Sequence, residues 1–243
     1  MYKPTYISYE CMVDFRKPAQ ESINGLAATL ASRYPNTEED APKSILLRHV
    51  STFPLSSGKV HVDLTLWKDR FGMRIGVGRH EEVGDENESL SPVPSASVSD
   101  ALGTFVDIWA QVAQLPIDEA SFMFFAALDQ DDRQARPRLG EALFSLTARP
   151  FGAKYDTALL FKWRASDPLP GTVVAQVLPI SPNGDHVHYT ATYVLDDKDL
   201  LNDPEAKWTL TVRDFFSLAV ESTPDLVHDV LGGGPNAASR SST

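Results

Sequence analysis

Hydrophobic and polar positions alternate along much of this chain, and the alternation divides into two similar series of elements. Strict alternation with a period of two predicts strands with one buried face, whereas apolar spacings of three and four predict helices. The first series has a strand, a helix, three strands and a second helix, expected at 5–16, 18–34, 45–53, 59–67, 71–78 and from about 97 to 115.

The second series begins with SFMFFAALD at 121–129, a continuous apolar run that predicts a buried central strand. A helix, three strands and a last helix follow, expected at 139–146, 157–165, 172–180, 186–196 and from Thr211. The two series predict an α+β fold with predominantly antiparallel sheet and helices on one face. The element order is β-α-β-β-β-α, written twice.

The clearest local pattern is a β-hairpin over 59–78, in which apolar residues occupy every second position of both strands. The alternate positions carry polar and charged side chains, and glycines leave space between them. These polar positions are His61, Asp63, Thr65, Arg70 and Arg74. The hairpin therefore presents one face to a core and another to solvent.

The domain organisation follows the repeated order. We expect two halves, 1–115 and 116–231, packed as one globular unit and followed by a disordered tail at 232–243. Acidic, Pro, Gly and Ser residues at 79–97 predict a flexible linker. The repeated order suggests tandem duplication, although the best internal match pairs the second strand of one meander with the third of the other. One continuous antiparallel sheet covered by helices is the alternative.

Charge narrows the class of partner. The chain of 243 residues has 22 Lys and Arg against 33 Asp and Glu, a formal charge of −11 with no basic run. Because phosphate contacts require a basic face, the composition argues against nucleic acid as a partner. An acidic surface suits solubility or a basic protein partner.

Location is predicted from the N-terminus and the cysteine content. The segment MYKPTYISYE lacks the apolar core of a signal peptide, and no apolar run is long enough to span a membrane. Cys11 is the only cysteine, so the chain forms no internal disulfide. We therefore expect a cytoplasmic protein that does not associate with membranes.

Histidines are the main candidates for site chemistry, since nucleophile elbows, phosphate loops and zinc signatures are absent. His186 and His188 alternate onto one strand face, and His61 lies with Asp63 on an earlier strand. This spacing is typical of imidazoles that share a divalent metal, but it also fits a polar strand face in solvent. We predict no resident cofactor and no identified catalytic residue, with this metal site as an alternative.

A groove between two such halves is a second candidate site, because fused α+β halves commonly bind ligands where they meet. Aromatic side chains near the expected meanders would line it. The candidates are Trp67, Trp163, Tyr189 and Tyr193.

One family resemblance is carried by the start of the chain. SYECMVDFR, a helix ending in ASRYP and the acidic residues that follow resemble a sporadically distributed family of uncharacterised bacterial proteins of about this length. The chain departs from that family in MFFAALDQ, its middle strand. The resemblance covers nearly the whole chain and implies an architecture but no activity.

Three functions follow from these observations. The first is a non-catalytic protein-interaction or accessory component of a bacterial system for defence, conflict or specialised metabolism, which the missing catalytic motifs favour. The second is a small-molecule-binding protein that uses the groove between halves. The third is a metal-dependent enzyme that uses the strand histidines.

Overall fold

A computed structural model describes residues 2–38, 42–55, 58–78, 91–130, 159–165, 171–179, 186–195 and 212–223. The first series of elements comprises β1 (Tyr2–Phe15), α1 (Gln20–Arg33), β2 (Ile45–Leu55), β3 (Gly58–Trp67), β4 (Arg70–Gly78) and α2 (Ser95–Val112). The second comprises β5 (Ile117–Gln130), β6 (Leu159–Ala165), β7 (Gly171–Pro179), β8 (His186–Leu195) and a helix at 212–223.

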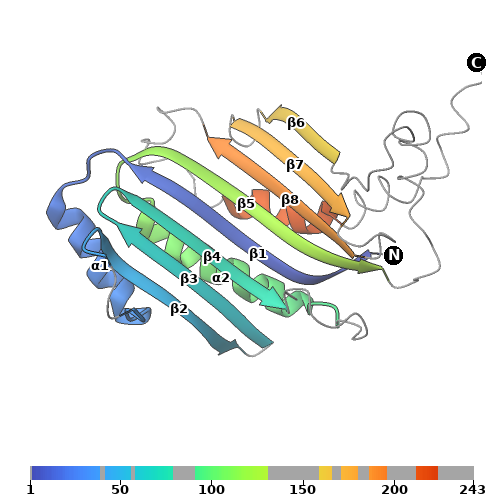
Figure 1. Cartoon of the computed structure of the whole chain (residues 1–243), viewed down its shortest axis with the longest axis horizontal. Coiled ribbons are helices and arrows are strands. Elements are labelled where there is room, and N and C mark those ends of the chain that lie inside the picture. The colour runs from blue at the N-terminus through green and yellow to red at the C-terminus, as the bar shows by residue number, and fades with distance from the viewer. Residues whose placement is uncertain are drawn as a thin grey trace, which may run out of the picture.

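The described strands form one eight-stranded sheet in the order β2-β3-β4-β1-β5-β8-β7-β6, shown in Figure 1. Every neighbouring pair is antiparallel. The buried residues of α1, α2 and the 212–223 helix belong to a single core cluster with one face of the strands. The predicted α+β fold, with antiparallel sheet and helices on one face, is confirmed.

The two halves of the chain join edge to edge at the centre of the sheet. β1 pairs with β5 from Tyr2 opposite Gln130 to Phe15 opposite Ile117, with register shifts near both ends. Outward from this seam, the order is β1-β4-β3-β2 on one side and β5-β8-β7-β6 on the other. A tandem duplication would produce this matched order, and a shared origin of the halves stays a prediction.

The predicted elements lie close to the observed ones, with local differences. β1 begins at Tyr2, and α2 begins at Ser95, so the last residues of the expected 79–97 linker belong to that helix. The expected 139–146 helix, the 232–243 tail and most of the linker lie outside the described residues. The apolar run at 121–129 lies in β5, between β1 and β8, as a central strand should.

Aromatic side chains fill the core beneath the seam. Tyr9 of β1 is fully buried, with its ring centroid 5.0 Å from Phe216 and 6.3 Å from Phe105. Trp109 of α2 meets Phe122 of β5 edge-on at 4.9 Å. Edge-to-face contacts of this kind add to the free energy of burying the rings, so the helices are fixed against both halves.

The strands carry this core because their apolar residues fall on alternate positions. Within the described part of the chain, no helix is long and apolar enough to cross a membrane.

Cys11 is buried among the apolar residues of β1, and burial raises the pKa of its thiol. A buried, protonated thiol is a weak nucleophile, so Cys11 acts as a core residue.

Candidate interaction surface on the open face of the sheet

The strand face opposite the helices has no described helix on it, and Figure 1 views the sheet from this side. We call it the open face. Side chains at alternate positions of each strand point onto it, as the register requires. In the half formed by β2, β3, β4 and β1, these residues include Arg48, Val50, Thr52, His61, Asp63, Thr65, Arg70, Arg74, Ser8, Glu10, Met12 and Asp14.

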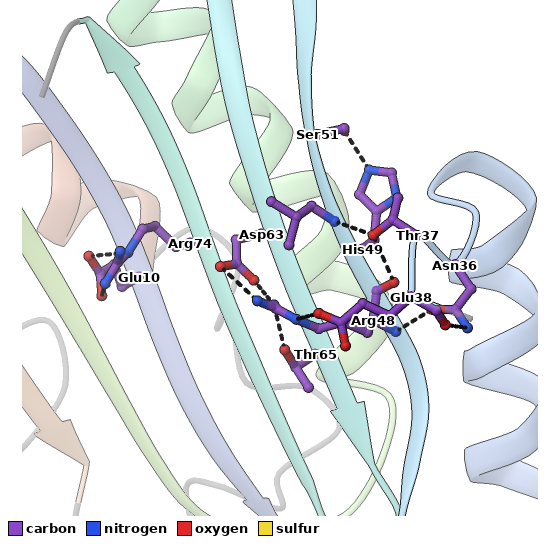
Figure 2. Close-up of polar contacts among 11 residues, drawn as sticks. Glu10, Asn36, Thr37, Glu38, Arg48, His49, Ser51, Asp63, Thr65 and Arg74 are labelled. Carbon is purple, nitrogen blue, oxygen red and sulfur yellow. Dashed lines mark hydrogen bonds and ion pairs between the residues drawn. The ribbon is translucent and has the colours of Figure 1, made fainter. Parts of the chain in front are cut away.

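Four charged side chains cross this half of the open face, one from each strand, as Figure 2 shows. They are Arg48 on β2, Asp63 on β3, Arg74 on β4 and Glu10 on β1, and we call them the charge ladder. Arg74 Nε forms an ion pair with Glu10 Oε1 at 2.8 Å, and Arg74 Nη2 donates to Glu10 Oε2 at 3.3 Å. Both arginine–carboxylate pairs are therefore two-pronged, because Arg48 also reaches both oxygens of Asp63.

Strand register builds the charge ladder. Asp63 lies directly opposite Arg74 in the β3–β4 pair, and Arg74 lies directly opposite Glu10 in the β4–β1 pair. Opposite charges at facing positions of antiparallel strands attract each other. Arg48 lies opposite Thr65, two register positions from the Val50–Asp63 pair, and its long side chain crosses to Asp63 while donating to Thr65 Oγ1 at 2.8 Å.

The pKa values of both arginines are raised, so both stay charged. For Arg48, the largest cause of the higher pKa is its hydrogen bonds to Asp63. For Arg74, partial burial lowers the pKa, but the charge and hydrogen bonds of Glu10, together with the charges of Tyr6 and Asp63, raise it by more. The two positive members of the ladder are therefore fully charged and are held in place by the carboxylates that they contact.

Two further ion pairs lie beside the charge ladder. Arg48 Nε donates to Glu38 Oε1 at 3.3 Å, which ties the segment after α1 to the sheet. Arg70 Nε donates to Asp14 at 2.5 Å between β4 and β1. These side chains are about half exposed, except that of Arg48. They surround the ladder with charges that are already paired.

Next to the ladder, the seam carries a polar and aromatic group. Ser8 Oγ donates to Glu10 Oε1 at 3.0 Å, although Ser8 itself is buried. Tyr6 lies over Gly76, where any Cβ would meet its hydroxyl oxygen at 2.4 Å. The Tyr6 ring meets Phe125 of β5 edge-on at 5.9 Å, so this aromatic contact spans the boundary between β1 and β5. The glycine on β4 makes space for a side chain of the neighbouring strand.

The outer edge of β2 is closed by residues 35–38, which we call the edge strap. Thr37 N donates to the carbonyl oxygen of Arg48 at 2.9 Å, and Arg48 N donates to Asn36 Oδ1 at 3.1 Å. Val50 N donates to Thr37 Oγ1 at 3.0 Å. Pro54, also in β2, has no N–H to offer. Strap and proline together occupy positions where another strand would pair.

His49 fixes the edge strap from beneath. Its imidazole is 2% exposed, with Nδ1 2.6 Å from the Pro35 carbonyl oxygen and Nε2 2.6 Å from Ser51 Oγ. The ring stacks on Phe53 at 5.7 Å. Both contacts are satisfied when Nδ1 donates to the carbonyl oxygen and Nε2 accepts from the serine hydroxyl.

The three predicted metal ligands lie on two separate strands, with His61 on β3 and the His186 and His188 pair on β8. Three strands lie between β3, which carries His61, and β8, which carries His188. At about 4.8 Å per strand, the two backbones are about 19 Å apart, too far to share one ion. His61 Nδ1 lies 3.4 Å from Thr52 Oγ1, and His188 packs edge-on against Phe125 at 5.0 Å. His186 occupies the register position opposite Asp129.

Among the described residues, no group of three or more His, Cys, Asp or Glu side chains is arranged to hold a metal ion.

The predicted ligand-lining residues are divided between the two sheet faces. Tyr189 and Tyr193 are 3% and 4% exposed in the core, where Tyr193 stacks on Phe215 at 5.2 Å. Trp67 lies on the open face beside Gly72, and the side chain of Trp163 lies outside the described residues. β1 and β5 pair where the two halves meet, and a ligand groove between the halves stays a prediction.

Residues of the charge ladder were only partly visible as candidates in the sequence. Asp63 and Arg74 fall on the predicted polar face of the hairpin, and Glu10 falls on a polar position of the strand expected at 5–16, but Arg48 carried no signal of its own. Their partners are distant in sequence, and only the strand order brings them together. The sequence signal that could have revealed the ladder was a pair of opposite charges at facing positions of two neighbouring predicted strands.

No protein-family model, curated protein or solved structure matches this chain. The resemblance to a bacterial family stays a prediction. Function is therefore inferred from the geometry of the open face.

Proposed function

We propose that this chain is a non-catalytic protein-interaction component of a bacterial system for defence, conflict or specialised metabolism, and that its partner protein binds the open face. The observation that carries the proposal is the charge ladder, a fixed row of four paired charges across a half-sheet face on which the structure describes no helix. Rigid strands that hold side chains in place reduce the entropy lost on binding.

The composition of the open face fits protein recognition. Met12 and Val50 lie beside the ladder, and their side chains are 43% and 37% exposed. Exposed apolar groups next to arranged charges resemble the mixed chemistry of non-obligate interfaces. The apolar groups would supply buried area, while the charges would select the partner and its orientation.

The closed edge of β2 supports binding on the face and not by strand addition at that edge. The edge strap satisfies the outward amides of Arg48 and Val50, so a strand added there would first have to displace it. The face requires no such rearrangement. A cytoplasmic location, in which Cys11 stays reduced, belongs to this proposal.

Site-specific photo-crosslinking tests the proposal. A photoreactive amino acid replaces Val50 or Met12 on the open face, and the matched control replaces Leu218 on the 212–223 helix, which is 65% exposed. In native-host extract, the open-face positions should give a discrete protein–protein product, and the Leu218 position should not. Products of equal yield at all three positions, or only at Leu218, would count against the proposal.

A further inference from the structure

The charge ladder alternates in sign. Read from β2 to β1, Arg48, Asp63, Arg74 and Glu10 give positive, negative, positive, negative. Read in reverse, the same row gives negative, positive, negative, positive. An alternating row with an even number of members is therefore complementary to its own reverse.

From this pattern we propose that the open face binds a second copy of this chain, face to face, about a two-fold axis parallel to the strands and between β3 and β4. This inference rests on the proposed function and names its partner. A two-fold interface uses the same patch on both copies, so the patch must complement itself. The charge ladder meets that requirement.

The direction of the axis follows from the charges. An axis parallel to the strands reverses the row, which places Arg48 of one copy over Glu10 of the other and Asp63 over Arg74. An axis along the row would instead place each residue over its own counterpart. Like charges would then face each other, which opposes association.

The size of the overlap sets the strength of the dimer. Four strands at about 4.8 Å spacing, overlapping over roughly eight residues of about 3.3 Å, cover about 500 Å² on each copy. The total of about 1,000 Å² lies at the lower limit of specific interfaces. Met12 and Val50 fall within the overlap and add apolar contact. The dimer should therefore be reversible and sensitive to salt.

A charge-swap series on the full chain tests this arrangement by analytical ultracentrifugation over a concentration range. E10R/R74E keeps the intramolecular pair but changes the row to positive, negative, negative, positive. R48E/D63R also keeps its pair and gives negative, positive, positive, negative. Both new rows are palindromes, so like charges face each other across the axis. Each swap should weaken the dimer at least tenfold, and circular dichroism with a thermal melt checks the fold.

Combining both swaps restores complementarity. E10R/R48E/D63R/R74E reads negative, positive, negative, positive, and this variant should dimerise again within about threefold of the wild type. Raising the salt concentration should weaken the wild-type dimer. This salt test needs no substitution, so its result does not depend on whether a variant folds. A wild-type chain that stays monomeric at every concentration would overturn the inference, and so would a swap variant that dimerises as well as the wild type.

The experiments can refute the dimer and the proposed function independently. A purified chain that stays monomeric, together with open-face crosslinks to a different protein in host extract, overturns the dimer and supports the proposed function. A monomer without open-face crosslinks overturns both. A dimer that is lost in both swaps and regained in the combined variant supports both.

Discussion

The guanidinium of Arg48 on β2 is bound through both terminal nitrogens to the carboxylate of Asp63 on β3. Their side chains are 23% and 29% exposed, whereas those of Arg70 and Asp14, paired on the same face, are 52% and 41% exposed. Less solvent around a two-pronged pair means less screening. The two pairs therefore offer a matched comparison.

Double-mutant cycles should separate the two pairs. With alanine at each position and at both, we expect a coupling free energy of about 1 kcal/mol for Arg48–Asp63 and about 0.3 kcal/mol for Arg70–Asp14. Urea unfolding of the four chains in each cycle provides the measurement. Equal couplings would show that the ladder pair gains nothing from its partial burial.

Gly76 should be intolerant of a side chain. A Cβ there would lie 2.4 Å from the Tyr6 hydroxyl oxygen and 3.0 Å from Tyr6 Cζ. We expect Gly76→Ala to lower the free energy of unfolding by about 1–3 kcal/mol, and by less in a Tyr6→Leu background. Gly25 of α1 has no atom within 4 Å of its added Cβ, so Gly25→Ala should raise stability by about 0.5–1 kcal/mol. Thermal unfolding that ranks the two substitutions in the opposite order would refute this assignment.

The edge strap should protect the outer amides of β2. Asn36→Ala removes the acceptor of the Arg48 N–H, with an expected loss of about 0.5–1.5 kcal/mol. Hydrogen exchange of the Arg48 amide should accelerate by a similar free energy. The control, Gln20→Ala, removes only an exposed bond to Asn24 within α1. Unchanged exchange at Arg48 in Asn36→Ala would show that the strap does not close this edge.

Stability should fall at alkaline pH. Burial raises the pKa of Cys11 above its ordinary 9.0 and that of Tyr9 above 10.0. Above pH 9.0 the unfolded thiol ionises while the folded thiol keeps its proton, so the unfolded state binds fewer protons and stability declines as pH rises. One such group contributes up to about 1.4 kcal/mol per pH unit. Below pH 9.0 its contribution should be constant.

The Cys11→Ala variant isolates the thiol. Its stability should be lower at every pH because of lost packing, but its decline between pH 9.0 and 10.0 should be shallower than that of the wild type. Chemical unfolding at a series of pH values gives both slopes. Parallel curves for the two chains would mean that Cys11 does not contribute to the alkaline loss.

Much of the fold could be predicted because alternation within a strand is a local property. The hairpin of β3 and β4, for example, has its apolar face and its polar face where the sequence places them. Tyr189 and Tyr193 share the apolar face of β8 and so lie in the core, which removes them from an exposed groove.

Strand order was the part that the sequence could not determine. Pairing of β1 with β5 joins residues more than a hundred positions apart, and no local pattern encodes that choice. The order separates His61 from His188, and it brings Glu10 to Arg74. Candidate sites built from residues on different strands therefore depended on information that only the structure contains.

Hydroxyl-radical footprinting of the full chain tests most directly whether the open face is the binding surface. Met12 is 43% exposed on that face, Leu218 is 65% exposed on the 212–223 helix, and Met73, at 4%, reports the buried baseline. Labelling is compared between dilute purified protein and native-host extract at matched radical dose. We predict that Met12 becomes protected in extract while Leu218 keeps its rate. Unchanged labelling of Met12, or protection of Leu218 alone, would contradict a binding role for the open face.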